Sequence, residues 1–237
     1  MKNLKNLIDL DKYKYAKSIL STAGSLGENE NLEVYVVGGF VRDLLMEKPL
    51  NDIDLMVVGD GIGFAKKLAR KLGQKKIVPF IKFGTAIIPN KKMNIEVATA
   101  RTEFYSQSSR KPTEVIYTSL KGDLSRRDFT INAMAMNILP NKFGDLTDPY
   151  NGKEDIKSKV LKTPLDPDET FAEDPLRMMR AAYFSSKLKF KLGQPLINSM
   201  KKTSSRIEIV SAERIRDEFI KILKTEKPSI GIIVLQK

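Results

Sequence analysis

Two aspartates, Asp52 and Asp54, stand two residues apart in NDIDLMVV, a run that is typical of a β-strand. Side chains alternate along a strand, so both carboxylates share a face, about 6 to 7 Å apart along the chain. Just upstream, Gly38 and Gly39 follow another strand-like run, LEVYVV, and glycines let a backbone come close to a phosphate. Paired carboxylates near such a turn suit a divalent metal and a nucleoside triphosphate. This stretch therefore predicts metal-assisted phosphoryl chemistry.

Two further features near this stretch have less specific signals. Glu96 lies in the β-rich run MNIEVATA and is either a third acidic group near the metals or an exposed residue at a sheet edge. The glycine-rich GDGIG at 59–63 lacks the Lys-Ser/Thr ending of a P-loop and the G-x-G-x-x-G spacing. We therefore expect GDGIG to be a strand-to-helix turn and not a phosphate loop.

The composition narrows the chemistry further. Cysteine and histidine are both absent, which excludes disulfides, Cys or His metal ligands and Ser-His-Asp triads. Acid, base and metal chemistry must come from carboxylates, lysine, tyrosine or arginine. The net charge of +12, from 41 basic and 29 acidic residues, favours a polyanionic partner such as nucleic acid. Scattered lysines that only aid solubility are the plainer alternative.

The elements that would position these residues follow from the apolar patterns. The chain lacks an apolar run near the ~20 residues that span a bilayer, and its start lacks a signal-peptide core, so we expect a cytoplasmic protein with no membrane partner. Helices are predicted at about 13–25 and 64–72. Short strands separated by Gly and Pro turns predict a mixed or antiparallel sheet. The polar segment 101–115 predicts a loop, and 129–138 an apolar helical or mixed run.

The pattern changes to long helical runs from about Phe171. Asp174-Pro175 marks a helix start, and Ser211 is a plausible N-cap of a later helix. We therefore predict an α+β protein: a head at 1–158 with a small sheet and flanking helices, followed by an all-helical portion at 159–237. The final KPSIGIIVLQK begins an apolar pattern without completing it, which favours a piece of a longer chain.

Several motifs occur in an order that resembles one known family. They are VGGFVRDLL, NDIDL, KFGTA, IEVATARTEFY, DLSRRDFTINAMA, DPYNGKEDI, EDPLRMMRA and SAERIRDE, spread over roughly residues 30 to 220. Together they resemble the head and neck of the class II tRNA nucleotidyltransferases, the family of CCA-adding enzymes and bacterial poly(A) polymerases. No single motif is specific, although GGxVRD with DxD comes closest. Body and tail helices of this family have no counterpart in the chain.

The resemblance implies roles at the phosphate end of a nucleotide. Asp52 and Asp54 would hold two Mg²⁺ ions, and Glu96 is the further candidate for a catalytic carboxylate. Gly38, Gly39 and Arg42 would contact the triphosphate. For Arg42 the alternative is a local ion pair with the neighbouring aspartate on a helix.

The resemblance also implies roles at the ribose and the base. Arg127 and Asp128 would meet the ribose and its 2′-OH, although a helix cap is equally compatible with them. Asp174 and Arg177 would read the base, since a carboxylate accepts from the exocyclic amino group of C or A while arginine donates to the ring nitrogen. Arg180 would support that site. Tyr183 stands where the family commonly has a further arginine.

The implied function is template-independent addition of CCA to tRNA 3′ ends from CTP and ATP, by two-metal in-line phosphoryl transfer. A poly(A) polymerase, or an enzyme that adds only CC or only A to an RNA 3′ end, is the first alternative. The polar segment RTEFYSQSSRKP is present, which argues against a CC-only enzyme. A non-catalytic nucleotide- or RNA-binding module is the second alternative, and the oligomeric state stays open.

Overall fold

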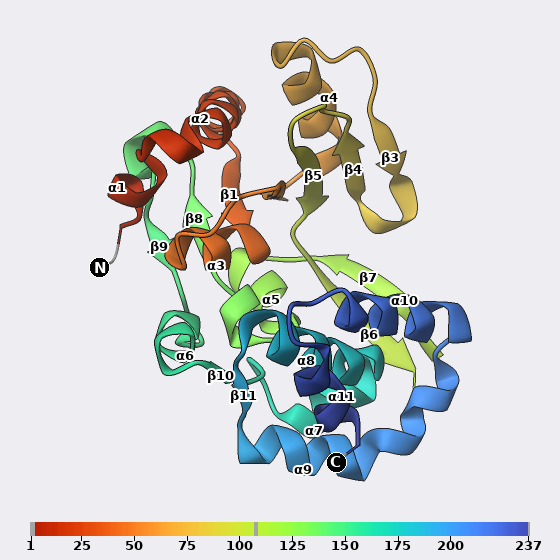
Figure 1. Ribbon diagram of the computed structural model, residues 1–237. Helices are drawn as coiled ribbons and strands as arrows, with labels where there is room; N and C mark the ends of the chain where they lie inside the picture. Colours follow the sequence, from red (N-terminus) through yellow and green to blue (C-terminus); the bar gives the residue numbers. More distant parts are fainter. Residues whose placement is uncertain (1–2, 107–108, 237) are drawn as a thin grey trace. The chain divides into compact units, whose positions relative to one another are not determined.

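The computed structural model describes residues 3–106 and 109–236, with side chains outside 102–117. The chain divides into two compact units, and each is treated by itself below (Figure 1). The first unit comprises Met1–Thr102, Ile116–Leu124 and Ile131–Lys153, and the second comprises Glu103–Val115, Ser125–Thr130 and Glu154–Lys237. The chain therefore leaves and re-enters the first unit, whereas the sequence predicted one boundary at 158/159. That boundary stays a prediction.

A mixed sheet forms the framework of the first unit. Its strands in the described part of the chain run in the order β3-β4-β5-β2-β1-β8-β9. Only β2 and β5 pair in parallel there, and the other neighbours are antiparallel. The strands are β1 (Glu33–Val37), β2 (Asp52–Val58), β3 (Val78–Phe80), β4 (Thr85–Ile88), β5 (Asn94–Thr99), β8 (Ala135–Asn137) and β9 (Leu146–Thr147). The predicted mixed sheet is confirmed.

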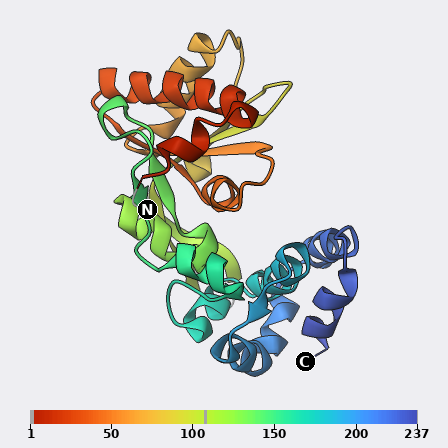
Figure 2. The same cartoon turned by 60° about the vertical axis from the view of Figure 1, so that its left-hand side comes forward.

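The helices of the first unit cover both faces of this sheet. α2 (Lys14–Asn29) packs on β1, and α4 (Gly61–Lys71) packs on β2, β4 and β5. α3 (Gly39–Leu45) contacts β1 and β2 from the face opposite α2 (Figure 2). Buried side chains on α2 recur at helical spacing, as Ala16, Ile19, Leu20 and Ala23, which places one apolar face on the core. Shorter elements are α1 (Lys5–Ile8), α5 (Leu120–Ser125) and the 3₁₀ turns Asp11–Tyr13, Ile81–Phe83, Thr130–Asn132 and Pro140–Lys142.

Alternation along β2 separates the core from the candidate site. Ile53, Leu55 and Val57 are almost fully buried beneath the helices, while Asp52 and Asp54 point the other way. Further along that second face a smaller apolar cluster closes the sheet, formed by Tyr35, Val37, Met56, Ala100, Leu124 and Ala135. The two aspartates therefore lie at the polar end of an otherwise buried strand.

Two local predictions can be compared with the structure here. GDGIG is a strand-to-helix turn as expected, because Asp60 caps α4 by accepting a hydrogen bond from the Gly63 N–H at 2.9 Å. The loop predicted at 101–115 is wrong: β6 (Arg101–Ser106) and β7 (Ser109–Tyr117) pair with each other instead. Polar composition misled the prediction, because strand pairing depends on backbone hydrogen bonds that polar residues also permit.

Helices dominate the second unit, so the predicted α+β class with a helical second part is confirmed. α10 (Ala212–Leu223) and α11 (Pro228–Leu235) pack on α8 (Leu176–Leu188), and α7 (Pro167–Glu173) packs on α9 (Gln194–Thr203). α6 (Gly152–Ser158), a 3₁₀ turn at Ser204–Ile209 and a short parallel pair, β10 (Val160–Leu161) with β11 (Lys191–Leu192), complete it. Within the described residues, no helix is long and apolar enough to cross a bilayer.

Candidate active site

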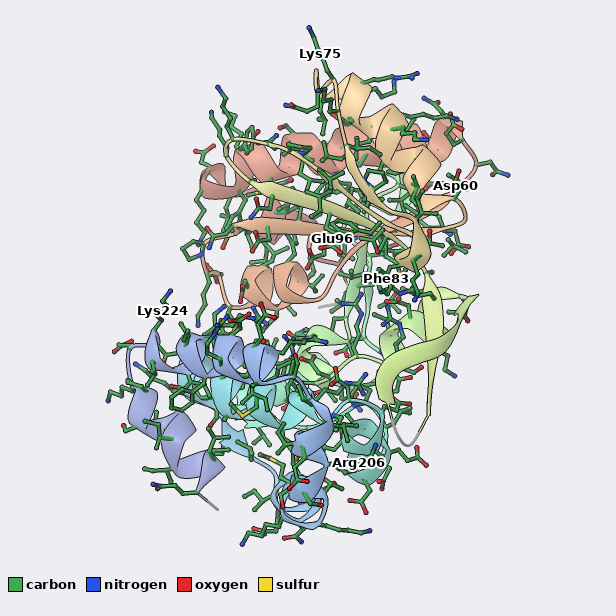
Figure 3. The ribbon with its side chains drawn as sticks, turned by 90° about the vertical axis from the view of Figure 1, so that its right-hand side faces the viewer. Asp60, Lys75, Phe83, Glu96, Arg206 and Lys224 are labelled. Atoms are coloured by element: carbon green, nitrogen blue, oxygen red, sulfur yellow. The ribbon has the colours of Figure 1, made fainter. Side chains whose placement is uncertain are left out.

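The parallel pair β2–β5 gathers four polar side chains on one face of the first unit. Asp52 lies opposite Asn94, and Asp54 lies opposite Glu96 in the strand register. Directly opposed residues of neighbouring strands share a face, so the three carboxylates stand on the same side of the sheet. Figure 3 shows Glu96 on the side facing away from α4. The Nδ2 of Asn94 donates to Oδ1 of Asp52 at 2.8 Å and so orients that carboxylate.

The donor set at this place fits a hard divalent cation. Asp52 is exposed and Asp54 is half-buried, so both carboxylates can exchange water for a ligand. No three acidic side chains of the described residues stand close enough to hold an ion by themselves. Mg²⁺ retains water and substrate phosphate in its shell, so two carboxylates are a sufficient protein contribution. Glu96 is exposed on β5, which is flanked by β4 and β2, so it is not at a sheet edge. Its catalytic role stays a prediction.

The Gly38-Gly39 turn lies beside the aspartates. β1 and β2 are antiparallel with Val36 opposite Leu55, so the next step of the register brings the end of β1 to Asp54. Gly38 has a φ of 69°, a backbone conformation that residues with a side chain rarely adopt. Its N–H donates to the carbonyl oxygen of Met134 at 3.1 Å. Glycine is therefore required at Gly38 by the turn itself, whatever the turn binds.

Arg42 is buried on α3 and already has partners within the first unit. Its Nε and Nη2 donate to the carboxylate of Asp43 at 2.9 and 2.8 Å, and its Nη1 donates to Oδ1 of Asn132 at 2.6 Å. The local ion pair considered as the alternative role for Arg42 is thus present, while its contact with a triphosphate stays a prediction. Asn132 was missed from the sequence; a single asparagine in the apolar run FTINAMAM was the available signal.

In the second unit, Asp128 and Arg180 form an ion pair. Nε of Arg180 donates to Oδ2 of Asp128 at 2.8 Å, Nη2 lies 2.6 Å from the same oxygen as an ion pair, and the Phe129 N–H donates to Oδ1 at 2.8 Å. The negative charge of Asp128 raises the pKa of Arg180 further, although burial opposes it. The guanidinium also lies 5.3 Å from the ring centre of Phe184. Arg127, the other predicted ribose contact, directly precedes Asp128 in the sequence and is half-buried.

Asp174 and Arg177 flank the start of α8. Asp174 is the C-cap of α7, and its Oδ1 accepts from the N–H of Leu176, the first residue of α8, at 3.1 Å. The buried guanidinium of Arg177 donates to the carbonyl oxygen of Thr170, to the Glu173 carboxylate and to the carbonyl oxygen of Arg126, at 3.1, 3.0 and 2.6 Å. The predicted base readers are therefore neighbours, joined through a backbone hydrogen bond, with Arg177 held firmly by the chain.

Tyr183 packs into the second unit. Its ring lies against the cluster of α8 and α10 residues, and its centre is 5.1 Å from the Phe184 ring. Lys187 places its ammonium 5.5 Å from the Tyr183 ring centre. The residue that departs from the family pattern thus contributes to packing.

The sequence-predicted site residues fall into two groups by unit. The first unit holds the candidates for the phosphate end: Gly38, Gly39, Arg42, Asp52, Asp54 and Glu96. The second unit holds the candidates for the ribose and base: Arg127, Asp128, Asp174, Arg177 and Arg180. A mixed sheet that carries paired aspartates beside a Gly-Gly turn, with a helical second unit, defines a nucleotidyltransferase-type head and neck.

Comparison with known proteins agrees with this class. The family model described as "Poly A polymerase head domain" matches residues 34–162, and the model "Probable RNA and SrmB- binding site of polymerase A" matches residues 189–237. The first match alone covers more than half of the chain. The chain belongs to the family of class II CCA-adding enzymes and bacterial poly(A) polymerases.

Individual relatives give the degree of similarity. A CCA-adding enzyme of Lactobacillus helveticus (strain DPC 4571) is 38% identical over 196 residues, which are 82% of this chain and 47% of the relative. An A-adding tRNA nucleotidyltransferase of Aquifex aeolicus (strain VF5) is 45% identical over 163 residues, 69% of this chain and 19% of the relative. The Thermotoga maritima CCA-adding enzyme complexed with tRNA superposes with a TM-score of 0.83 at 31% identity, covering 99% of this chain and 53% of that one. The chain thus spans about half the length of the CCA-adding relatives that it matches.

Proposed function

We propose that this chain carries the catalytic head and nucleotide-selecting helices of a template-independent RNA nucleotidyltransferase that extends tRNA 3′ ends with C and A. The observation that carries the proposal is the placement of Asp52 and Asp54 on one face of β2, beside Glu96 and the Gly38 turn. The names of the relatives supply the reaction class, since they are CCA-adding and A-adding tRNA nucleotidyltransferases. The proposed substrates are CTP, ATP and an RNA 3′ end.

Asp52 and Asp54 would hold two Mg²⁺ ions through their carboxylate oxygens. When bound, these ions lower the pKa of the attacking 3′-OH and neutralise charge on the pyrophosphate that leaves. The strand fixes the direction of both carboxylates, and the hydrogen bond from Asn94 fixes the rotamer of Asp52. Glu96 adds negative charge beside Asp54, which favours cation binding at this place.

At the phosphate end, the backbone of Gly38 and Gly39 would approach the triphosphate. No Cβ stands between that turn and the ligand, and Gly38 holds a conformation that keeps the turn tight. The guanidinium of Arg42, on the helix that follows this turn, would contribute positive charge, and its hydrogen bonds to Asp43 and Asn132 keep it in place. A preorganised cation of this kind stabilises charge without moving during the reaction.

At the ribose and base end, the second unit would supply selection. Asp128, held by Arg180, would accept a hydrogen bond from a ribose hydroxyl, with Arg127 beside it. Asp174 would accept from the exocyclic amino group of C or A and disfavour the oxygen that U and G present there. The three hydrogen bonds that Arg177 donates to Thr170, Glu173 and Arg126 use three of its five N–H groups, so the other two could donate to a ring nitrogen of the base. A mismatch that strands a buried polar group costs about 1–3 kcal/mol, or roughly ten- to a hundredfold.

The range of nucleotides added is the finer question. The relatives include CCA-adding and A-adding enzymes at similar identity, so both outcomes are within reach of this head. Poly(A) addition and CC-only addition stay alternatives, as does a non-catalytic module that binds nucleotide and RNA. The cytoplasmic location expected from the sequence also stays a prediction.

Primer extension on residues 1–237 tests the proposal. tRNA transcripts that end before CCA, or after CC, are incubated with Mg²⁺ and labelled CTP, ATP or both, and products are sized on a sequencing gel. CCA addition requires both nucleotides on the first primer, A addition extends only the CC primer by one residue, and poly(A) activity gives long products from ATP alone.

Matched variants make the test specific for the aspartates. Asp52→Asn and Asp54→Asn should each abolish incorporation, whereas Asp9→Asn, which removes a surface carboxylate of the same unit, should leave it unchanged. Calorimetry with Mg²⁺-ATP provides a second readout if turnover is slow. Unchanged incorporation in Asp52→Asn and Asp54→Asn would rule out the proposed role, and metal-dependent binding without turnover would favour the non-catalytic module.

A further inference from the structure

The positive charge of this chain is concentrated in one segment. Residues 61–95 contain nine basic residues and no acidic one, whereas the remainder of the chain is nearly balanced. The nine are Lys66, Lys67, Arg70, Lys71, Lys75, Lys76, Lys82, Lys91 and Lys92, and we refer to them as the basic edge. Most of the net charge of +12 therefore belongs to a small part of the first unit.

The fold places this segment at one margin of the sheet. It forms α4, β3, the 3₁₀ turn Ile81–Phe83, β4 and the turn before β5, and β3 is the outermost strand in the described part of the sheet. All nine basic side chains are exposed. Among the described residues, only Lys67 of the nine has an acidic partner, which is Glu30. Like charges left without counter-charges repel each other, so this edge favours an external polyanion.

Exposed apolar side chains lie within the same edge. Val78, Phe80, Ile81 and Phe83 are 48%, 43%, 78% and 40% exposed. Lys75 and Lys76 precede this group in the sequence and Lys82 lies within it; Figure 3 shows Lys75 and Phe83 at opposite ends of the segment that contains β3. Several exposed apolar side chains within one short segment are unusual on a surface and favour an interaction site.

The chemistry of the edge selects among possible occupants. An added protein strand is disfavoured, because β3 has three residues and its centre is Pro79, which cannot donate a hydrogen bond. A second copy of the chain would bring two basic edges together, which like-charge repulsion opposes. Single-stranded RNA fits both features, because phosphates pair with lysines while bases stack on exposed aromatic rings.

We propose that the basic edge, with Phe80 among its exposed apolar side chains, is a binding surface for single-stranded RNA. It lies apart from the carboxylates of β2, on the strand at the margin of the sheet, and its use does not depend on nucleotide or metal. Phosphates contact Lys76, which precedes the apolar group, and Lys82, which lies within it, and a base stacks on Phe80. The surface would hold a primer or a neighbouring single-stranded segment independently of catalysis.

Fluorescence anisotropy tests the proposal on residues 1–237, with a labelled oligouridylate of about 12 nucleotides, which matches the span of such sites. No nucleotide or Mg²⁺ is added, so the result is independent of the proposed catalytic function. Lys76→Gln/Lys82→Gln should weaken binding about five- to tenfold and reduce the slope of log K against log salt by about 1.4, since each phosphate contact on a single strand contributes about 0.7. Phe80→Ala should weaken binding roughly fivefold or more, and Phe80→Tyr should restore it.

The controls come from the opposite margin of the same sheet. Lys5→Gln/Lys142→Gln removes two exposed lysines near β9 and should leave affinity and salt slope unchanged. Circular dichroism checks that every variant is folded. Equal losses in both lysine pairs, or full binding by Phe80→Ala, would overturn the proposal. So would equal affinity for a blunt RNA duplex or for anionic lipid vesicles, or a dimer in light scattering that the Lys76/Lys82 variant alters.

Discussion

The Asp128–Arg180 ion pair allows a quantitative prediction for the second unit. Asp128 is 8% exposed, and Oδ2 of its carboxylate accepts a hydrogen bond from Nε of Arg180 and forms an ion pair with Nη2. Arg180→Met removes those donors but keeps an apolar stem of similar length against Phe184. The carboxylate of Asp128 then stays in a buried position without the charge of Arg180.

The magnitude follows from burial. Removing one partner of a fully buried ion pair costs about 3–5 kcal/mol. The side chain of Arg180 is 34% exposed, so water replaces part of what is lost. We expect Arg180→Met to lower the free energy of unfolding by about 2–3 kcal/mol, of which loss of the cation–ring contact is about 0.5–1 kcal/mol. The double variant Asp128→Asn/Arg180→Met should lose less free energy of unfolding than the two single variants lose together, and the difference, the coupling energy, should be about 2 kcal/mol.

A double-mutant cycle measures this coupling. Urea unfolding of the four proteins is followed by circular dichroism, and the dependence on urea concentration is compared to confirm that the unfolded state is unchanged. The ring contact with Phe184 is lost in both Arg180→Met backgrounds, so it cancels in the cycle. A coupling energy below about 0.5 kcal/mol would refute a buried ion pair, because solvent-exposed ion pairs give values in that range.

Three further predictions concern the first unit. Burial raises the pKa of Tyr35 to about 12, so the stability that its neutral phenol contributes is present below pH 10 and is lost between about pH 10 and 12. In urea titrations over that range, the free energy of unfolding of the wild type should fall by at most about 2 kcal/mol more than that of Tyr35→Phe. Parallel pH curves for the two proteins would contradict this. Gly24→Ala should lower the melting temperature although alanine favours helices, because its Cβ would stand 1.8 Å from the carbonyl oxygen of Ile138; a higher melting temperature would refute the clash. Asn132→Ala removes the acceptor of Arg42 Nη1 and should lower the free energy of unfolding by about 1–3 kcal/mol, whereas Asn132→Asp keeps an acceptor and should lower it less. Equal stability of these two variants would exclude the role of Asn132 as that acceptor.

The parts of the site that the sequence could predict are local. The shared face of Asp52 and Asp54 follows from the two-residue period of a strand, and the structure has both on β2. Gly38 was expected at a tight turn, and its φ of 69° agrees. The class of the chain followed from motif order over most of its length. These inferences succeed because they need only spacing within one element or the order of elements.

The parts that the sequence could not supply depend on long-range packing. Asn132 lies 90 residues from Arg42, and Asp128 lies 52 residues from Arg180, so neither pair has a periodic signal. Which carboxylate meets which arginine depends on the fold. The β6–β7 pair was predicted as a loop for a related reason, since its polar residues have no apolar alternation to reveal a strand.

Three of the four arginines assigned to nucleotide contacts are tied to acceptors within their own unit. Arg42 bonds Asp43 and Asn132, Arg177 bonds Glu173 and two carbonyl oxygens, and Arg180 bonds Asp128. A guanidinium has five N–H groups in a rigid plane, so bonds on one edge orient the remaining donors. Ordering a flexible side chain on binding would cost about 0.5–1.5 kcal/mol each, which these bonds largely remove beforehand. Under the proposed function, a guanidinium whose orientation is fixed in this way would meet one nucleotide with its donors already in place, which is the physical basis that we propose for selection.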